Sequence, residues 1–397
     1  MAAALAFFRK IASLIRLGAP PMLLLRVARW IARFLAREFA PQYVVILAAM
    51  IGLGVLLGVL DGSVGVAVLV ALALLLALEL RFAWLAWRSA HAIEAELQEE
   101  IPGDPPESRF PKTHLWFPLL MLFASSVKVE RGIIFHREKR RRVRLDIYRS
   151  KNGVPEGGRL PAVIQVHGGG WILGSRSEQG IPLLNHLAAN GWIGFNVDYR
   201  LSPRATLPEH VIDVKRAIAW VREHADELGV DPSRIAITGG SAGGHLTALA
   251  ALTANDPSLQ PGFEDADTSV IAAVPFYGVY DLADETHFYP QFHDWLFAKV
   301  VMKKPLAEAR DEYRAVSPIH RVHSDAPPFL IFHGDQDTLV PVADARAFTK
   351  RMEDTSKSAV LYVELPGAEH AFDIFPSLRT ARVVECIERF LRTEAGR

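Results

Sequence analysis

Residues 234–246 read RIAITGGSAGGHL and place Ser241 among four glycines. The apolar run before the glycines predicts a strand, and the residues from His245 to Leu252 predict the start of a helix. A serine with small neighbours at such a strand-to-helix turn is typical of the nucleophile turn G-x-S-x-G, which holds the serine strained and exposed at the edge of a sheet. The alternative interpretation is a glycine-rich loop that binds phosphate.

The residues around Ser241 exclude two nucleotide-binding motifs. A phosphate-binding loop needs a lysine and then Ser or Thr after its last glycine, whereas this chain continues with His245, Leu246 and Thr247. The glycines also do not fall at the G-x-G-x-x-G spacing of a dinucleotide site. The nucleophile turn is therefore the interpretation that the other motifs have to support.

A second glycine-rich segment directly follows another predicted strand. Residues 167–170 read HGGG, and glycine permits both positive φ angles and a close approach of the backbone to a reacting group. We expect this segment to supply backbone amides for an oxyanion hole, with the amide of Ala242 as the other donor. His167 is expected to be structural rather than a catalytic base.

The remaining two members of a serine-hydrolase triad also follow predicted strands. Asp335 and Asp337 lie in the turn after the apolar run that ends at Phe332, and His370 lies in a loop after the run that ends at Leu365. The order serine, acid, histidine is that of the α/β-hydrolase arrangement. The two aspartates are two residues apart and cannot both point the same way. We expect Asp335 to cap backbone amides and Asp337, farther out in the loop, to hold His370.

The chain from about residue 128 onward alternates short apolar strands with helical segments. The helical spacing is clearest in residues 210–228. Apolar strands that alternate with helices predict a mainly parallel sheet with helices on both faces, which is an α/β fold. The predicted strands are 143–148, 162–166, 192–197, 235–237, 270–276, 329–332 and 360–363.

These motifs together resemble those of the hormone-sensitive-lipase-like esterases and, more closely, those of the compact bacterial carboxylesterases of the α/β-hydrolase superfamily. The resemblance covers about residues 128–395. The lipase-like branch usually has Asp before the nucleophile, where this chain has Gly240, and its acid motif also differs. Plant isoprenylcysteine methylesterases have a similar layout, with membrane spans before the hydrolase. The matching segments are RLDIYR (144–149), HGGGW (167–171), DYRLSP (198–203), GGSAGG (239–244), HGDQDTLVP (333–341) and GAEHAF (367–372).

The resemblance implies an α/β-hydrolase fold and a role for each matching residue. It makes Ser241 the nucleophile, Asp337 the orienting acid and His370 the base. The implied reaction is hydrolysis of a lipophilic carboxylic ester through an acyl-enzyme, without a cofactor. The alternatives are an amidase, a thioesterase or an arylformamidase with the same triad, or a non-catalytic hydrolase-fold module that binds partners at the membrane. The implied oxyanion amides are those of Gly169, Gly170 and Ala242, and the supporting residues are His167, Gly168, Gly239 and Gly243.

Charge and spacing argue against other classes of ligand. The 44 basic and 44 acidic side chains give no net charge that would attract nucleic acid. The basic stretch 137–149 lacks a nucleic-acid motif and predicts a solvated strand edge. The 14 histidines show no H-x-x-x-H or cysteine pairing, so no metal site is expected. The single cysteine, Cys386, excludes an intrachain disulfide and is expected in the core.

The first hundred residues differ from the rest of the chain, which is 50% hydrophobic overall. Residues 43–60 and 64–78 carry no charge. The length of each run is close to that of a membrane-spanning helix, which needs about 20 residues. With a turn at 61–63, they predict a transmembrane hairpin over 42–90; the alternative is two buried helices of a soluble core. Close helix approach and interfacial anchoring would come from Gly54, Gly58, Trp84 and Trp87.

Residues 1–41 predict a basic amphipathic helix on an anionic membrane surface. By the positive-inside rule this end is cytoplasmic, and two spans return the chain to the same side, so the catalytic domain is expected in the cytoplasm. The basic residues of the segment are Arg9, Lys10, Arg16, Arg26, Arg29, Arg33 and Arg37, of which the last four share one helical face.

Two further segments, residues 114–126 and 287–297, each allow two interpretations. Residues 91–127 predict a linker, with four prolines in 101–111, before the catalytic domain at 128–397. The apolar stretch 114–126 within it is either a lid over the active site or a membrane-surface segment. The aromatic insertion 287–297 is either local core or one wall of an acyl pocket.

Overall fold

The computed structural model describes residues 13–98, 101, 110–118, 121, 126–138, 141–154, 157–289 and 293–396. Within that part of the chain, eight strands form one sheet in the order β1-β2-β4-β3-β5-β6-β7-β8. The β1–β2 and β2–β4 pairs are antiparallel and all other pairs are parallel. The strands are β1 Val127–Glu138, β2 Arg141–Ser150, β3 Leu160–Val166, β4 Ile193–Val197, β5 Val230–Gly240, β6 Ala273–Phe276, β7 Phe329–Gly334 and β8 Val360–Leu365.

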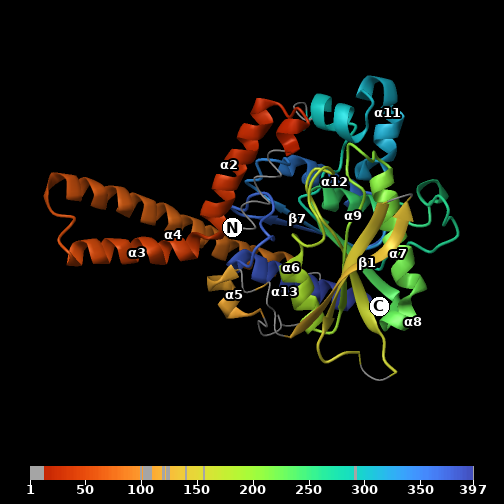
Figure 1. Ribbon diagram of the computed structural model, residues 1–397, viewed down its shortest axis with the longest axis horizontal. Coiled ribbons are helices and arrows are strands. Elements are labelled where there is room, and N and C mark those ends of the chain that lie inside the picture. Colours follow the sequence, from red (N-terminus) through yellow and green to blue (C-terminus); the bar gives the residue numbers. More distant parts are fainter. Residues whose placement is uncertain are drawn as a thin grey trace.

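Helices cover both faces of the sheet (Figure 1). Helices α7 (Glu209–Glu223), α9 (Ala242–Leu252) and α12 (Val342–Glu353) pack with one set of strand side chains, and α6 (Ile181–Ala189) and α13 (Leu378–Ala395) pack with the other. Strands buried on both faces have to be apolar at successive positions, which is why β3 and β5 contain continuous apolar runs. The predicted mainly parallel sheet with helices on both faces is confirmed.

Strand β1 did not stand out in the sequence because its apolar alternation is interrupted. Its register against β2 shifts between Glu130 and Ile133 and again between Ile134 and His136. Bulges of this kind turn successive side chains off the two-residue period. The short elements outside the sheet are α5 Lys112–Trp116, α8 Ala225–Leu228, η2 Pro257–Leu259, the π-helix η3 His293–Val301, α11 Leu306–Ala315 and η4 Pro318–His320.

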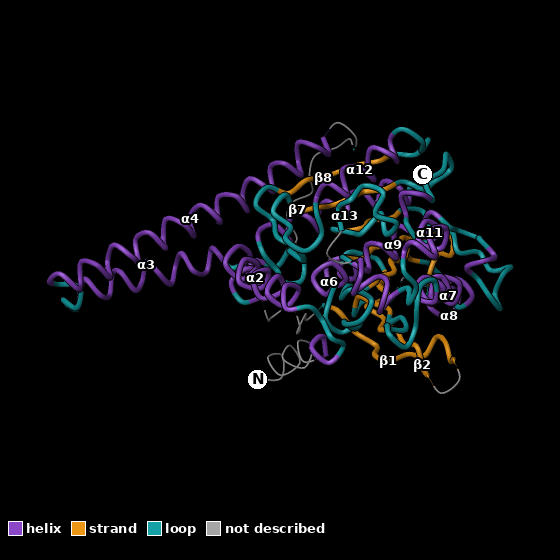
Figure 2. The backbone as a smooth tube through the Cα atoms, turned by 90° about the horizontal axis from the view of Figure 1, so that it is seen from above, coloured by secondary structure: helices purple, strands orange, loops and turns teal. Residues whose placement is uncertain are grey.

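Three N-terminal helices precede the sheet: α2 (Pro21–Glu38), α3 (Ala40–Leu56) and α4 (Gly62–Gln98). Figures 1 and 2 both show α3 and the first half of α4 projecting from the domain as an antiparallel pair, while α2 lies against the domain. Helices α2 and α3 meet at an angle of 73°. The bend falls at Phe39, just before the first turn of α3, which contains Pro41 and so lacks one backbone N–H.

The turn of this hairpin lies earlier than the sequence suggests. Helix α3 ends at Leu56, and both Gly58 (φ +66°) and Gly62 (φ +77°) adopt left-handed backbone angles that other residues rarely adopt. The turn is therefore 57–61 rather than 61–63. Since Gly58 lies in the turn, the expected helix face formed by Gly54 and Gly58 is not present.

Helix α4 also extends past the expected boundary at residue 90. Its second half packs against β8 and α13, where Ser89 is fully buried and Ile93 is 2% exposed. The 34 residues Gly62–Ala95 are long and apolar enough to cross a membrane, and 11% of their most apolar window is buried. Most of this apolar stretch is therefore exposed.

Several predicted features fall partly outside the described residues. These are Arg9 and Lys10 of the basic segment, residues 99–100, 102–109, 119–120 and 122–125 of the linker, and residues 290–292 of the aromatic insertion. The described residues of 114–126 lie beside α3 and α6, since Gln42 donates to the carbonyl oxygen of Leu115 and Asn185 donates to that of Met121. None of these described residues lines the pocket that contains Ser241.

Candidate active site

Ser241 occupies the turn between β5 and α9. Its φ of 59° and ψ of −122° lie in a region that non-glycine residues rarely adopt, so the turn is strained as the motif requires. Its backbone N–H donates to the carbonyl oxygen of Phe276 at 3.0 Å. A Cβ on Gly239 or Gly243 would clash with the carbonyl oxygen of Val166, because α9 begins against the end of β3. The small residues therefore bring the serine close to the segment that follows β3.

That segment is the predicted oxyanion loop. Gly169 has a φ of +120°, and its carbonyl oxygen accepts hydrogen bonds from the N–H groups of Ile172 (3.2 Å) and Leu173 (2.9 Å). The carbonyl thus points into the loop's own turn. Gly168 donates its N–H to Oε1 of Gln179 at 2.6 Å.

His167 lies behind the loop. It is 1% exposed, and its ring stacks on Tyr199 with centroids 4.4 Å apart. Its Nδ1 is 2.9 Å from the carbonyl oxygen of Gly168. The side chain does not line the pocket that contains Ser241.

Asp337 and His370 are in direct contact. Oδ2 of Asp337 is 2.6 Å from Nδ1 of His370, and Oδ1 accepts from the N–H groups of Leu339 and Val340 at 2.8 Å each. Because the carboxylate accepts, the proton lies on Nδ1 and leaves Nε2 of His370 free to take a proton. Burial raises the pKa of Asp337, but the charge of His370 and the hydrogen bonds from both neighbouring histidines outweigh burial and hold that pKa well below its usual value.

The second of those histidines is His333, which the sequence argument did not single out. Its Nε2 is 3.3 Å from Oδ2 of Asp337 and 3.0 Å from the carbonyl oxygen of Val340, and the side chain is fully buried. His333 comes from the end of β7, so the strand itself positions it under the acid loop. Its position four residues before Asp337 was the available signal.

Asp335 has a different partner. Its Oδ1 accepts the backbone N–H of Gly367 at 2.7 Å, and burial raises its pKa. Asp337 thus contacts His370, whereas Asp335 contacts the backbone N–H of Gly367.

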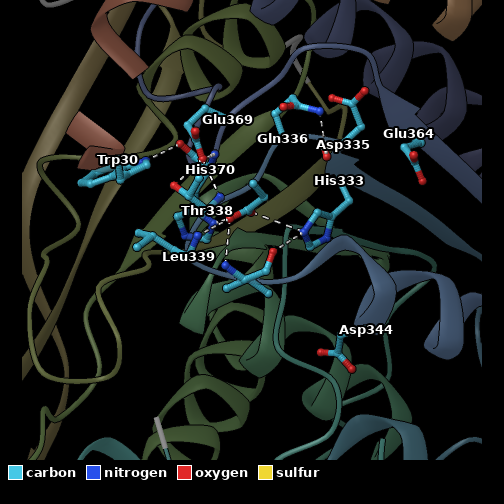
Figure 3. Close-up of polar contacts among 12 residues, drawn as sticks. Trp30, His333, Asp335, Gln336, Thr338, Leu339, Asp344, Glu364, Glu369 and His370 are labelled. Atoms are coloured by element: carbon cyan, nitrogen blue, oxygen red, sulfur yellow. Dashed lines mark hydrogen bonds and ion pairs between the residues drawn. The ribbon is translucent and has the colours of Figure 1, made fainter. Parts of the chain in front are cut away.

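Glu369 connects the acid loop to the base loop. Its Oε1 accepts from the N–H and the hydroxyl of Thr338 at 2.6 and 2.9 Å and from the N–H of His370 at 3.2 Å. Its Oε2 accepts from Nε of Arg33 in α2 at 2.7 Å. Figure 3 shows Glu369, Thr338 and Trp30 close to His370. The indole N–H of Trp30 donates to the carbonyl oxygen of His370 at 2.8 Å.

A cavity of about 220 Å³ opens beside these residues. Ser241, His370, Gly169, Gly170 and Ala242 all line it. Most other wall residues are apolar, and many of them come from the N-terminal segment, the oxyanion loop and the aromatic insertion. The apolar residues from these three segments are Leu14, Leu23, Val27, Trp30, Trp171, Ile172, Leu173, Trp295, Leu296 and Phe297, and others are Val279, Leu339, Val340, Ala371 and Ile374.

Two of these three segments, the aromatic insertion and the N-terminal segment, can be compared with what the sequence predicts. The aromatic insertion 287–297 supplies pocket wall through Trp295, Leu296 and Phe297, and two of these are also buried in the core, so both of its interpretations apply. The contribution of α2 was not foreseen, because its apolar face was assigned to a membrane surface. Two of its predicted membrane-facing arginines, Arg33 and Arg37, contact the base loop instead.

Two buried tyrosines that line the cavity donate their hydroxyl groups to carboxylates. Tyr277 donates its hydroxyl to Asp373, and its ring centroid is 4.5 Å from that of His370. Tyr289 donates its hydroxyl to Oδ2 of Asp344 at 2.5 Å. Within the described residues, no group of three or more His, Cys, Asp or Glu side chains is arranged to hold a metal ion.

Comparison with known proteins identifies a family profile and several esterases that are similar to this chain. The BD-FAE family profile matches residues 145–352. The chain is 48% identical to the probable carboxylic ester hydrolase LipM of Mycobacterium tuberculosis over 69% of this chain and 63% of that protein. It is 32% identical to an arylesterase of Saccharolobus solfataricus over 61% of this chain and 75% of that protein. The chain spans about three fifths of the length of the mycobacterial relatives that it matches.

A solved structure agrees with these relatives. The thermophilic esterase of Thermogutta terrifontis with butyrate bound superposes with a TM-score of 0.58 at 29% identity, covering 68% of this chain and 95% of that one. The matches and the sheet order together establish an α/β-hydrolase fold for the region after the N-terminal helices.

Proposed function

The chain belongs to the BD-FAE family, and from that premise we propose that it is a serine carboxylic-ester hydrolase with Ser241 as nucleophile, His370 as base and Asp337 as orienting acid. One observation carries the proposal. Ser241, His370 and the three residues proposed to supply the oxyanion amides line a single apolar cavity, and Asp337 contacts Nδ1 of His370. Nucleophile, base and acid in this relation are what acyl transfer requires.

The reaction proceeds in two halves. Nε2 of His370 takes the proton of the Ser241 hydroxyl while Oγ attacks the ester carbonyl carbon, and the resulting oxyanion accepts hydrogen bonds from the oxyanion amides. The carbon–oxygen bond to the alcohol breaks, and the alcohol leaves with the proton from His370. Water then loses a proton to His370 and attacks the acyl-enzyme, which releases the carboxylic acid and restores Ser241. Asp337 stays ionised throughout and stabilises the imidazolium.

The substrate class follows from the walls of the cavity. Its lining is almost entirely aliphatic and aromatic, so it suits an uncharged acyl chain and offers no partner for a charged one. The volume of about 220 Å³ is below the about 300–1,000 Å³ usual for small-molecule sites. A short to medium acyl chain on a lipophilic ester is therefore the preferred substrate.

We also propose that α3 and the first half of α4 form a membrane hairpin. Large apolar side chains along both arms are exposed, such as Leu56 (81%) and Val64 (76%). Trp84 and Trp87 are half exposed farther along α4 toward the domain, which suits anchors at a membrane interface. The basic excess in residues 1–41 orients this end, and the catalytic domain with it, to the cytoplasm. Protease added to intact cells then spares the catalytic domain, and its digestion from outside would refute this orientation.

A p-nitrophenyl ester series from acetate to palmitate, assayed on the full chain in detergent micelles, tests the proposed activity. We expect hydrolysis with a maximum at short or medium chains, complete loss of turnover in Ser241→Ala, and fluorophosphonate labelling of the wild type alone. Near-normal turnover in Ser241→Ala would refute the mechanism. Labelling without hydrolysis of esters, but with cleavage of the matching thioester or anilide, would identify a thioesterase or amidase instead.

A further inference from the structure

The loop that carries His370 is held along its length by the N-terminal helices. The hydroxyl of Ser89 in α4 donates to the carbonyl oxygen of Pro366 at 2.9 Å, and Nη1 of Arg37 donates to that of Gly367 at 2.9 Å. Trp30 holds the carbonyl oxygen of His370 itself. Residues more than 270 positions away in the chain therefore fix the backbone of the base loop.

Within this set, the pair of Arg33 and Glu369 reaches the catalytic groups most directly. The Glu369 side chain is fully buried and that of Arg33 is 25% exposed. One carboxylate oxygen of Glu369 holds Thr338, the residue after Asp337, and the N–H of His370. The other oxygen is bound by Arg33. A single carboxylate thus spans the acid loop, the base loop and α2.

The energetics of a buried carboxylate make this contact consequential. Removing the cation from a buried ion pair leaves an uncompensated charge, which is more costly than losing the same pair at the surface. Glu369 would then turn toward water, which weakens its hold on Thr338 and His370. Since Glu369 precedes His370, the imidazole would shift relative to Asp337 and Ser241.

Helix α2 is in turn fixed at its other end. Glu38, the last residue of α2, forms a buried ion pair with Arg379 of α13 and accepts from the hydroxyl of Ser377 at 2.9 Å. Phe39 alone separates α2 from α3, the first arm of the projecting hairpin. The position of the hairpin is thereby connected to the base loop through one rigid helix.

We propose that Arg33 and Glu369 are positioning residues, whose ion pair transmits the docked position of α2 to His370 and Asp337. The inference rests on the proposed esterase function. In this proposal α2 helps to position the catalytic residues. The triad is aligned for catalysis when α2 is docked against the catalytic domain, and it loses this alignment when α2 is displaced.

Matched arginine substitutions in α2 test the proposal, with the full chain in detergent micelles and p-nitrophenyl butyrate as substrate. Arg33→Met is expected to lower kcat about 10- to 100-fold, the scale of a small misplacement of a catalytic group. KM should stay within about twofold, because Arg33 does not line the cavity and uniform binding is unaffected. Arg33→Lys should recover part of the kcat. Arg29→Met removes the same charge from an exposed position of the same helix and should match the wild type.

A second background separates positioning from a general stabilising role. The Glu369→Gln variant has no buried carboxylate for Arg33 to neutralise. Adding Arg33→Met to this variant should therefore change kcat by less than about threefold. An equal loss in both backgrounds would overturn the proposal, as would a kcat of Arg33→Met close to that of the wild type. If Arg33→Met does not fold, Arg33→Gln takes its place, because Gln keeps hydrogen-bond donors but removes the charge, and a kcat of Arg33→Gln close to that of the wild type overturns the proposal. A wild type that hydrolyses no ester refutes the proposed function, not this pair.

Discussion

Oδ2 of Asp337 lies 2.6 Å from Nδ1 of His370, and both side chains are at most 5% exposed. The contact joins the loop after β7 to the loop after β8. Because these strands are parallel neighbours, their carboxyl ends meet at one edge of the sheet. The same edge receives Ser241 from the end of β5, so the sheet order brings the three residues together.

The two aspartates of the acid loop should respond differently to amidation. Asp337→Asn is expected to lower turnover on the order of 10⁴-fold with the fold retained, because the amide can impose the wrong tautomer on His370. Asp335→Asn should mainly lower the free energy of unfolding, by about 1 kcal/mol for a weakened hydrogen bond to Gly367. Ester hydrolysis and urea unfolding of both variants check this. An inactive but stable Asp335→Asn would reverse the assignment.

Trp30 should control the length of the acyl chain. Its indole forms part of the cavity wall and also donates to the carbonyl oxygen of His370. Trp30→Ala is expected to enlarge the cavity and raise the ratio of kcat/KM for the decanoate over the butyrate ester. Trp30→Phe keeps most of the wall and should preserve the ratio while lowering kcat through the lost hydrogen bond. An unchanged chain-length profile in Trp30→Ala would show that α2 does not bound the acyl site.

Asp344 should make the stability of the protein fall as pH rises. Burial raises the pKa of this carboxyl to about 7, although it accepts from the N–H of Tyr280 and the hydroxyl of Tyr289. Its unfolded pKa is about 3.9, so between these values the folded state holds the proton that the unfolded state has lost. The contribution is fully present below about pH 4, declines by up to about 1.4 kcal/mol per pH unit, and is lost above about pH 7.

The matching measurement compares wild type and Asp344→Asn by urea unfolding from pH 4 to pH 8. Asparagine cannot ionise, so the variant should lack this decline and gain stability relative to the wild type toward pH 8. Parallel pH profiles for the two proteins would contradict the assignment of the decline to Asp344.

Removing the projecting parts of α3 and α4 should leave the esterase activity intact. Replacing residues 50–70 by a short Gly-Ser linker removes the outer part of the hairpin but leaves α2 and the docked half of α4, which contact the catalytic domain. We expect this variant to leave the membrane fraction and keep its esterase activity, since the remaining apolar runs are too short to span about 30 Å. Deleting residues 1–60 also removes Trp30, Arg33 and Arg37, and should abolish activity. Membrane retention of the first variant would show that another segment is the anchor.

The sequence by itself determined the fold class and the candidate chemistry. Strand periodicity, the glycines around Ser241 and the order of Ser241, Asp337 and His370 are local signals, because each depends on a few consecutive residues and on chain order. They were sufficient for a parallel sheet and for a triad that stays a prediction until activity is measured. Boundaries such as the hairpin turn at 57–61 were displaced because α3 ends just before the left-handed Gly58 and α4 begins at the left-handed Gly62.

The tertiary structure alone decided what α2 does. A basic amphipathic helix suits a membrane surface or a protein surface equally well, and nothing within residues 21–38 indicates which one it meets. Trp30 and His370 are 340 residues apart, and Arg33 and Glu369 are 336 apart. These pairs form because α4 returns along β8 and α13 and brings α2 against the carboxyl edge of the sheet. Contacts at such separation depend on how whole elements dock, so they leave no periodic trace in either segment.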